Sequence, residues 1–151
     1  MRPYFLTVLG RLAEEAPARV LLVAPPDHPL LAALRERLPG AVLDLAAADA
    51  LPAQRYDVAL VAETLEALAP AAARELLAAL RDRLAAHVVL WLDTARAPVD
   101  EEGLRALGYR ILARDGTQLL GGFDLYDYKD RPDWLNSRNW AHPELWEKYR
   151  W

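Results

Sequence analysis

Apolar positions in the chain up to residue 107 follow two different patterns. Short continuous apolar runs are typical of strands that are buried on both faces of a sheet. These runs lie at 19–24, 41–45, 57–62 and 87–92. Between them, apolar residues recur every three or four positions, which is the period of a helix with one buried face. The stripes predict helices over 3–16, 29–38, 70–84 and 100–107.

Two further strand-like segments, 109–114 and 118–125, flank the dipeptide Asp115-Gly116. Asp-Gly between two such segments is a strong signal for the turn of a β-hairpin. Strand–helix alternation followed by a hairpin predicts an α/β fold with a mostly parallel sheet, flanking helices and a C-terminal antiparallel hairpin. The connections between the parallel strands are expected to be right-handed.

The chain has 151 residues, a formal net charge of −4 and no cysteine. This length predicts a single domain over 1–151, made of an N-terminal helix (1–18), an α/β core (19–125) and an aromatic tail (126–151). The negative charge gives no general attraction to nucleic acid or to anionic lipid. Without cysteine there is no disulfide or thiolate, and no apolar run reaches the roughly 20 residues of a membrane span, so a cytoplasmic protein is expected.

The turn after the first predicted strand reads Ala24-Pro25-Pro26-Asp27-His28-Pro29. Open α/β sheets bind ligands at the carboxyl ends of their strands, so Asp27 and His28 are candidates for contacts to a cofactor. The alternative is structural, because either side chain can accept a hydrogen bond from the free N–H groups of a helix that begins at Pro29. The sequence leaves both roles open.

Three acidic residues are candidates for the same edge of the sheet. Asp44 lies 20 residues after Ala24, a spacing that suits an acid bound to ribose hydroxyls, although strand-end aspartates also occur without ligands. Glu63 and Glu66 follow the strand at 57–62, and paired carboxylates can do acid–base chemistry when burial raises the pKa of one of them. Their alternative role is to cap or solvate the start of the next helix.

Signatures of several other sites are missing from the sequence. His28, His87 and His142 show no metal-ligand spacing, so no metal site is predicted. The sequence also has no Gly-x-Ser-x-Gly motif and no Walker loop. The ends of the strands therefore remain the candidate positions for a site.

Residues 56–93 combine a strand that begins Tyr56-Asp57-Val58, a turn with Glu63, the stretch Leu65-Glu66-Ala67-Leu68, a long helix and an apolar strand. In this order they resemble the second half of a class I S-adenosylmethionine-dependent methyltransferase, and the terminal hairpin is similar to that family's antiparallel edge. The resemblance extends over residues 19–125 and implies a Rossmann-like, methyltransferase-type fold with S-adenosylmethionine as cofactor.

The resemblance also gives roles to individual residues. Asp49, in the stretch AAADALP, is similar to the family's aspartate that contacts adenine. Glu63 is expected near the cofactor and the reacting groups. The alternative for Asp49 is a loop aspartate that bonds to neighbouring backbone groups.

The sequence departs from that family at the turn after the first strand. The family normally has Gly-x-Gly there, because glycine lets the backbone approach the cofactor closely. Here the turn holds two prolines, which lack N–H donors. The stretch from Val23 to Asp57 is also short for the family, as if one β-α unit were missing. Residues 21–40 therefore match either the family's first strand and helix with a rewritten turn, or its second strand and helix with the glycine turn absent.

The tail, residues 126–151, is rich in tryptophan and tyrosine with interleaved basic residues, and with the core it resembles a small bacterial family of uncharacterised proteins. Aromatic side chains beside arginine are typical of protein interfaces, so a protein partner or a homo-oligomer is expected. The alternatives are that the tail packs over the sheet and completes its core, or that it stacks on exposed RNA bases. Residues 124–151 carry five basic and six acidic side chains, a net charge of −1, which disfavours nucleic acid. The predicted interface residues are Trp134, Trp140, Trp146 and Trp151.

The proline turn, with no evident replacement for the glycines, favours a degenerate methyltransferase-like protein. Such a pseudoenzyme would need no cofactor and would act through binding or assembly. The alternative is an S-adenosylmethionine-dependent methyltransferase with a rebuilt cofactor loop, in which Asp44, Asp49 and the region of Glu63 hold the cofactor. A second alternative is an RNA-associated module that uses the tail.

Overall fold

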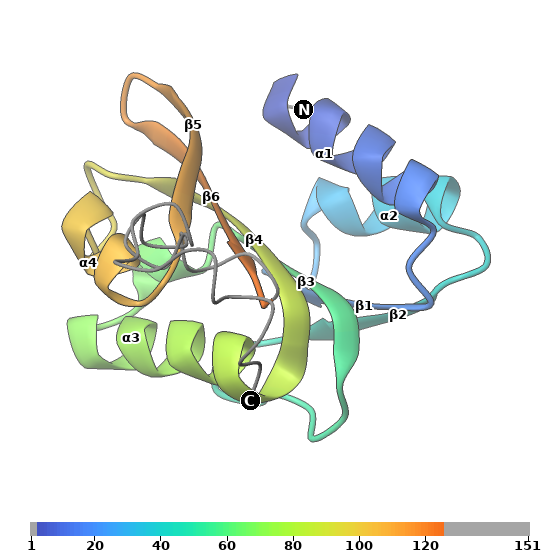
Figure 1. Cartoon of the computed structure of the whole chain (residues 1–151), viewed down its shortest axis with the longest axis horizontal. Helices are drawn as coiled ribbons and strands as arrows, with labels where there is room; N and C mark the ends of the chain where they lie inside the picture. The colour runs from blue at the N-terminus through green and yellow to red at the C-terminus, as the bar shows by residue number, and fades with distance from the viewer. Residues whose placement is uncertain (1–2, 126–151) are drawn as a thin grey trace, which may run out of the picture.

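Six strands form one sheet with helices on both faces (Figure 1). The computed structural model describes residues 3–125, with side chains from residue 6 onward. The strands are β1 (Arg19–Val23), β2 (Val42–Ala46), β3 (Tyr56–Ala62), β4 (Ala85–Asp93), β5 (Arg110–Asp115) and β6 (Gln118–Asp124). The helices are α1 (Pro3–Glu15), α2 (Pro29–Arg37), α3 (Pro70–Ala79) and α4 (Glu101–Ala106), with a 3-10 turn η1 (Leu65–Ala67) and a π-helical turn η2 (Leu80–Leu84).

The strand order in the sheet is β2-β1-β3-β4-β6-β5. The strands β2, β1, β3 and β4 are parallel, whereas β6 is antiparallel to both β4 and β5. The turn between β5 and β6 contains Gly116 at a φ of 59°, a left-handed conformation that glycine adopts without steric cost. The predicted α/β fold with a C-terminal antiparallel hairpin is therefore confirmed.

The strand β1 lies inside the sheet, between β2 and β3. In the doubly wound strand order 3-2-1-4-5-6, the first strand lies beside the fourth, and the second does not. Because residues 20–23 of β1 pair directly with residues 58–61 of β3, β1 has the position of a first strand and β3 that of a fourth. Of the two alignments that the sequence left open, the sheet supports the one in which the turn after β1 takes the place of the glycine turn.

The doubly wound strand order also shows where the missing β-α unit would lie. In the doubly wound order a further strand lies outside the second one. Here β2 is the edge strand of the described sheet, and Val42 in it is 52% exposed. The chain is therefore shorter at the rim of the sheet and not at its centre.

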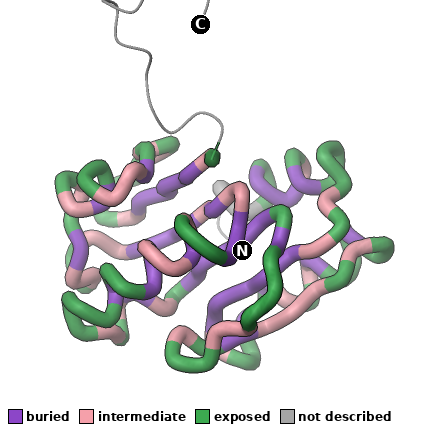
Figure 2. The backbone as a smooth tube through the Cα atoms, turned by 60° about the horizontal axis from the view of Figure 1, so that its bottom comes forward, coloured by how far each residue is buried: buried purple, intermediate pink, exposed green. Residues whose placement is uncertain are grey.

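Two apolar cores cover the two faces of the sheet, and the strands between them are mostly buried (Figure 2). Side chains alternate between these faces: Leu22 packs in the core below α1 and α2, and Leu21 in the core below α3 and α4. The first core takes from its helices Leu9, Leu12, Leu30 and Leu34. Within residues 3–125, no helix has the length and apolar character needed to cross a membrane.

The predicted helix over 70–84 is divided into two parts. The α-helix ends at Ala79, and the backbone continues in the wider π-helical turn η2 until Ala85 begins β4. Leu80 and Leu84 remain buried across this change, so the predicted inward stripe is correct. Apolar spacing did not distinguish the two helix types, because it reports which side chains face the core and not how wide the last turn is.

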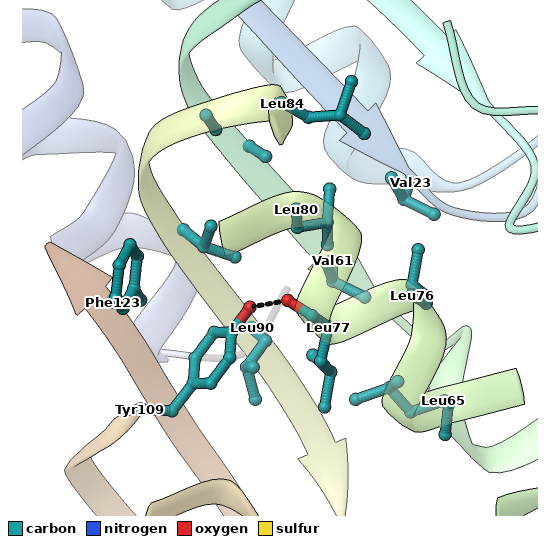
Figure 3. Close-up of a cluster of buried hydrophobic side chains, with 14 of the residues drawn as sticks. Val23, Val61, Leu65, Leu76, Leu77, Leu80, Leu84, Leu90, Tyr109 and Phe123 are labelled. Atoms are coloured by element: carbon teal, nitrogen blue, oxygen red, sulfur yellow. Dashed lines mark hydrogen bonds between the residues drawn. The ribbon is translucent and has the colours of Figure 1, made fainter. Parts of the chain in front are cut away.

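Tyr109 connects the hairpin side of the sheet to α3 (Figure 3). Its side chain is buried, its hydroxyl donates a hydrogen bond to the Leu77 carbonyl at 2.7 Å, and its ring lies 5.8 Å from the Phe123 ring between centroids. Burial raises the pKa of the Tyr109 hydroxyl, so the group keeps its proton and remains a donor. This contact anchors the start of β5 against α3.

Tyr109→Phe is expected to lower the free energy of unfolding by about 1 kcal/mol, because a buried hydrogen bond is lost while the ring still packs. Urea unfolding followed by circular dichroism measures the change. The control is Val42→Ala, at an exposed residue of the edge strand β2, which is expected to have a smaller effect. An unfolding midpoint that is the same in Tyr109→Phe and in the parent would contradict the role of this hydroxyl.

Candidate functional site

The central strands β1 and β3 end side by side, and the chain leaves them toward opposite faces of the sheet. The helix α2, which follows β1, packs in one core, and α3, which follows β3, packs in the other. Such a reversal is the topological switch point at which open α/β sheets bind ligands. The candidate site is therefore the edge formed by the turns at 24–28 and 63–68.

The turn at 24–28 is closed by its own residues. The His28 N–H donates to the Pro25 carbonyl at 3.1 Å, and Pro26 has no N–H to offer a ligand. His28 is also the N-cap of α2, and its Nδ1 accepts a hydrogen bond from the Leu30 N–H at 3.2 Å. The His28 side chain is 3% exposed. The N-terminus of α2, which in many proteins binds anions, is thus covered by this imidazole.

Glu63 faces His28 across the switch point. The Oε2 atom of Glu63 lies 3.6 Å from Nε2 of His28, and the Glu63 side chain is mostly exposed. Glu63 has a φ of 50°, in the left-handed region that residues other than glycine rarely adopt. Backbone strain of this kind concentrates at functional sites, so the position marks the turn after β3 as the part of this edge to test for function.

Thr64 joins the ends of the two central strands. Its hydroxyl lies 3.0 Å from the Val23 carbonyl of β1 and 3.0 Å from the Ala62 carbonyl of β3. A hydroxyl has one proton to donate, so the two carbonyls share it. This hydroxyl therefore links the ends of β1 and β3.

Glu66 links the turn after β3 to the end of β4. Its Oε1 accepts a hydrogen bond from the Asp93 N–H at 2.8 Å, whereas its Oε2 is buried with no hydrogen-bond partner among residues 3–125. A pocket of about 220 Å³ lies beside it, lined by Glu63, Glu66, Ala67 and Arg96. Small-molecule sites usually measure roughly 300–1,000 Å³, so this pocket is small for a cofactor.

Asp93, at the end of β4, is held in its charged form. Its carboxylate accepts a hydrogen bond from the Ala95 N–H at 3.0 Å and lies 3.5 Å from the Arg96 guanidinium. The hydrogen bond from Ala95 makes the largest contribution to lowering the pKa of Asp93, and contacts with Thr117 and Arg96 lower it further. Asp93 therefore adds a negative charge next to the pocket.

Asp44 lies within β2 and not in the turn after it. Its Oδ2 accepts a hydrogen bond from the Tyr56 hydroxyl at 2.6 Å, and the Arg19 guanidinium lies over the Tyr56 ring, 5.6 Å from its centroid. Burial, followed by the contact with Asp44, raises the pKa of Tyr56 to about 12. Asp44 thus connects β2 to the start of β3, and its contact with a ribose stays a prediction.

The structure brings together only some of the residues that the sequence nominated. His28 and Glu63 meet at the switch point, and Glu66 lines the same pocket as Glu63. Asp27 and Asp49 are exposed in the turns after β1 and β2, and their predicted cofactor contacts stay predictions. The predicted interface residues Trp134, Trp140, Trp146 and Trp151 lie outside the described residues.

Sequence reasoning missed two residues of this edge, Thr64 and Arg96. Thr64 directly follows Glu63, and a hydroxyl placed straight after a buried strand is a usable signal for a bond between strand ends. Arg96 comes from the loop after β4, and only the pairing of β3 with β4 places it at the pocket. No local pattern in the sequence could have revealed that contact.

A family model with the description "Family of unknown function (DUF6231)" matches residues 5–151. The chain belongs to this family. The match runs through the core and the aromatic tail, so the DUF6231 family includes both. No curated protein matches the DUF6231 chain.

Solved methyltransferase structures share the fold of this DUF6231 chain. A Nostoc punctiforme protein assigned as an O-methyltransferase matches at 12% identity with a TM-score of 0.62, over 79% of this chain and 55% of that one. Human N-acetylserotonin methyltransferase in complex with S-adenosylmethionine matches at 10% identity with a TM-score of 0.55, over 80% and 51% of the two chains. The methyltransferase domain of bacterial CtHen1-CN matches at 12% identity with a TM-score of 0.58, over 81% and 97%.

The DUF6231 chain spans about half the length of the first two of these proteins. At identities of 10% and 12% the likeness shows the fold alone. It confirms the methyltransferase-like, Rossmann-type core that the segment 56–93 predicted.

His28→Ala is expected to lower the free energy of unfolding by about 1–2 kcal/mol, because the Leu30 N–H loses its acceptor at the start of α2. His28→Asn keeps a side-chain acceptor and is expected to recover much of the loss. Thermal and urea unfolding of both variants measure the difference. If the two variants are equally destabilised, the contribution of His28 comes from the packing of its ring and not from the cap.

Tyr56 gives a prediction on pH. Because folding raises the pKa of Tyr56 to about 12, its stabilising contribution is complete below the unfolded pKa of about 10 and is lost as the pH rises through about 12. The parent is therefore expected to be more stable than Tyr56→Phe at neutral pH, and the difference should shrink in this alkaline window. Urea unfolding at a series of pH values measures it, and a difference that stays constant across the window would contradict the assignment.

Proposed function

We propose that this DUF6231 chain is a methyltransferase-like pseudoenzyme that acts through binding or assembly and not through methyl transfer. The observation that carries the proposal is the closed turn after β1. At the place where a methyltransferase-type fold has its glycine turn, His28 caps α2 with a buried side chain. The turn thus stabilises the start of α2.

The residues at this edge do not fit S-adenosylmethionine. Its methionine portion ends in a carboxylate, which backbone N–H groups at a helix N-terminus can bind. Pro25 and Pro26 have no N–H, and the Leu30 N–H already donates to His28. The pocket of about 220 Å³ beside Glu63 is also below the usual size of a small-molecule site.

A catalytic alternative rests on a separate observation. Glu63 and Glu66 line one pocket at the switch point, and Glu66 has a buried oxygen without a hydrogen-bond partner in the described part of the chain. Two neighbouring carboxylates of unequal burial can serve as acid and base. In this alternative the chain is an S-adenosylmethionine-dependent methyltransferase, and the turn at 24–28 is a rebuilt cofactor loop.

The composition of the segment 126–151 supports a protein partner or a second copy of the chain. It combines four tryptophans with three arginines, and these residue types are enriched among the residues that dominate the energetics of protein interfaces. Its basic and acidic residues are balanced, whereas a nucleic-acid site favours a positive excess. We place the proposed binding activity on the surface that this segment forms together with the part of the chain that it contacts.

Calorimetric titration of the full chain with S-adenosylmethionine and S-adenosylhomocysteine tests the proposal. No binding heat is expected up to millimolar ligand, because two prolines remove N–H donors from the turn after β1 and the His28 imidazole caps the start of α2. A Pro26→Gly/His28→Gly variant restores one N–H and removes the imidazole, so it serves as the matched comparison. Binding of either ligand to the parent at micromolar concentration would overturn the proposal and favour the enzyme.

A further inference from the structure

In Figure 1 the helix α1 and the hairpin of β5 and β6 lie on the same side of the molecule. Residues of both line a groove that is larger than the pocket beside Glu63. Its volume is about 640 Å³. Val89, Leu120 and Gly122 contribute to its lining from β4 and β6. Leu112 of β5 also lines it and is 55% exposed. Leu120 and Gly122 are buried, so the apolar surface that the described elements leave open in the groove includes Leu112 and the half-buried Val89.

The topology explains why this part of the sheet is open. The helices α1 and α2 share a core with β1 and β3, whereas α3 and α4 pack on the other face. Above β6 and β5, on the face that carries α1, the described chain supplies no helix beyond α1 at the groove wall. An antiparallel pair such as β5 and β6 can face water on one side, and Leu112 on this side is 55% exposed and therefore open to a further contact.

We propose that the C-terminal segment of the same chain, residues 126–151, fills this groove. The segment starts at the groove, because Asp124 lines it and Leu125 is fixed by a 2.9 Å hydrogen bond from its N–H to the Ala86 carbonyl. Trp134 follows Leu125 by nine residues, which span about 30 Å when extended. The first tryptophan of the segment can thus reach any part of the groove.

The chemistry of the groove matches that of the segment. Tryptophan side chains bury large apolar surfaces and leave one N–H for a polar partner at the rim. The groove has apolar walls and a rim with charges of both signs, including Arg11, Glu15 and Arg110. The segment likewise combines tryptophans with balanced acidic and basic residues.

The chain's own segment is favoured over that of a second copy. A segment tethered at the groove has a high effective concentration there, and no second chain has to be ordered. The DUF6231 model also spans the core and the segment as one unit. The inference concerns where the segment sits, so it does not depend on the proposed function.

Cross-linking of the full chain tests the placement, since the chain has no cysteine of its own. Thr7→Cys, on the α1 wall of the groove, is combined with Ser137→Cys in the segment, and a short bismaleimide is added. The control pairs Arg74→Cys with Ser137→Cys, because Arg74 is exposed on α3 at the other face of the sheet. An intramolecular cross-link is expected for the first pair and a large loss of yield for the control.

Each other outcome of this experiment counts against the proposal. Cross-linked dimers from the first pair would place the segment in the groove of a second copy. Equal yields from the two pairs, or no cross-link in either, would show that the segment does not occupy the groove. None of these outcomes depends on whether the protein binds S-adenosylmethionine.

Tryptophan emission gives a second test that does not need cysteine. Leu112→Glu places a charge in the groove, and Val42→Glu is the matched control because Val42 is 52% exposed on the edge strand β2. We expect Leu112→Glu to shift the emission to longer wavelength and to increase quenching by acrylamide, and Val42→Glu to leave both unchanged. The same emission and quenching in both variants would overturn the proposal.

Discussion

Complete burial of β1 is the constraint on which the rest of the structure depends. The residues from Val20 to Val23 are each 0% exposed, and β1 pairs with β2 on one side and β3 on the other. These four positions hold only apolar side chains, so the polar contacts of β1 come from Arg19 at its start and from the turn that follows its end. The cap by His28 and the hydroxyl of Thr64 then satisfy backbone groups where the ladder stops.

The sequence was sufficient to predict the strands but not their order. Each strand of the parallel sheet is an apolar run, and Asp115-Gly116 marks the hairpin turn. An apolar run shows that a strand is buried but not which strand lies next to it, so two alignments of residues 21–40 fitted equally well. The ladder between β1 and β3 decided between them, and such a contact joins segments that no local pattern connects.

The candidate site was less predictable than the fold, because spacing along the chain does not give the direction of a side chain. Asp44 has the spacing of a ribose ligand, yet its carboxylate accepts the hydroxyl of Tyr56. The sequence predicted a helix that begins at Pro29 with Asp27 or His28 as its cap, and the cap by His28 is confirmed, but no pattern could choose between the two residues. The φ of 50° at Glu63 could not be predicted, because a left-handed backbone is expected at glycine and the sequence has glutamate at this position.

The position of β2 at the rim bears on how this architecture can be shortened over evolutionary time. A strand at the rim shares only one ladder with the sheet, so the loss of a unit there breaks fewer pairings than the loss of a unit inside it. The interior ladders of β1 with β3 and of β3 with β4 need nothing from outside β2. A sheet of this type can therefore lose a unit at this rim while its central strands keep their pairings. The central strands can be retained whether or not the residues at the strand ends carry out a reaction.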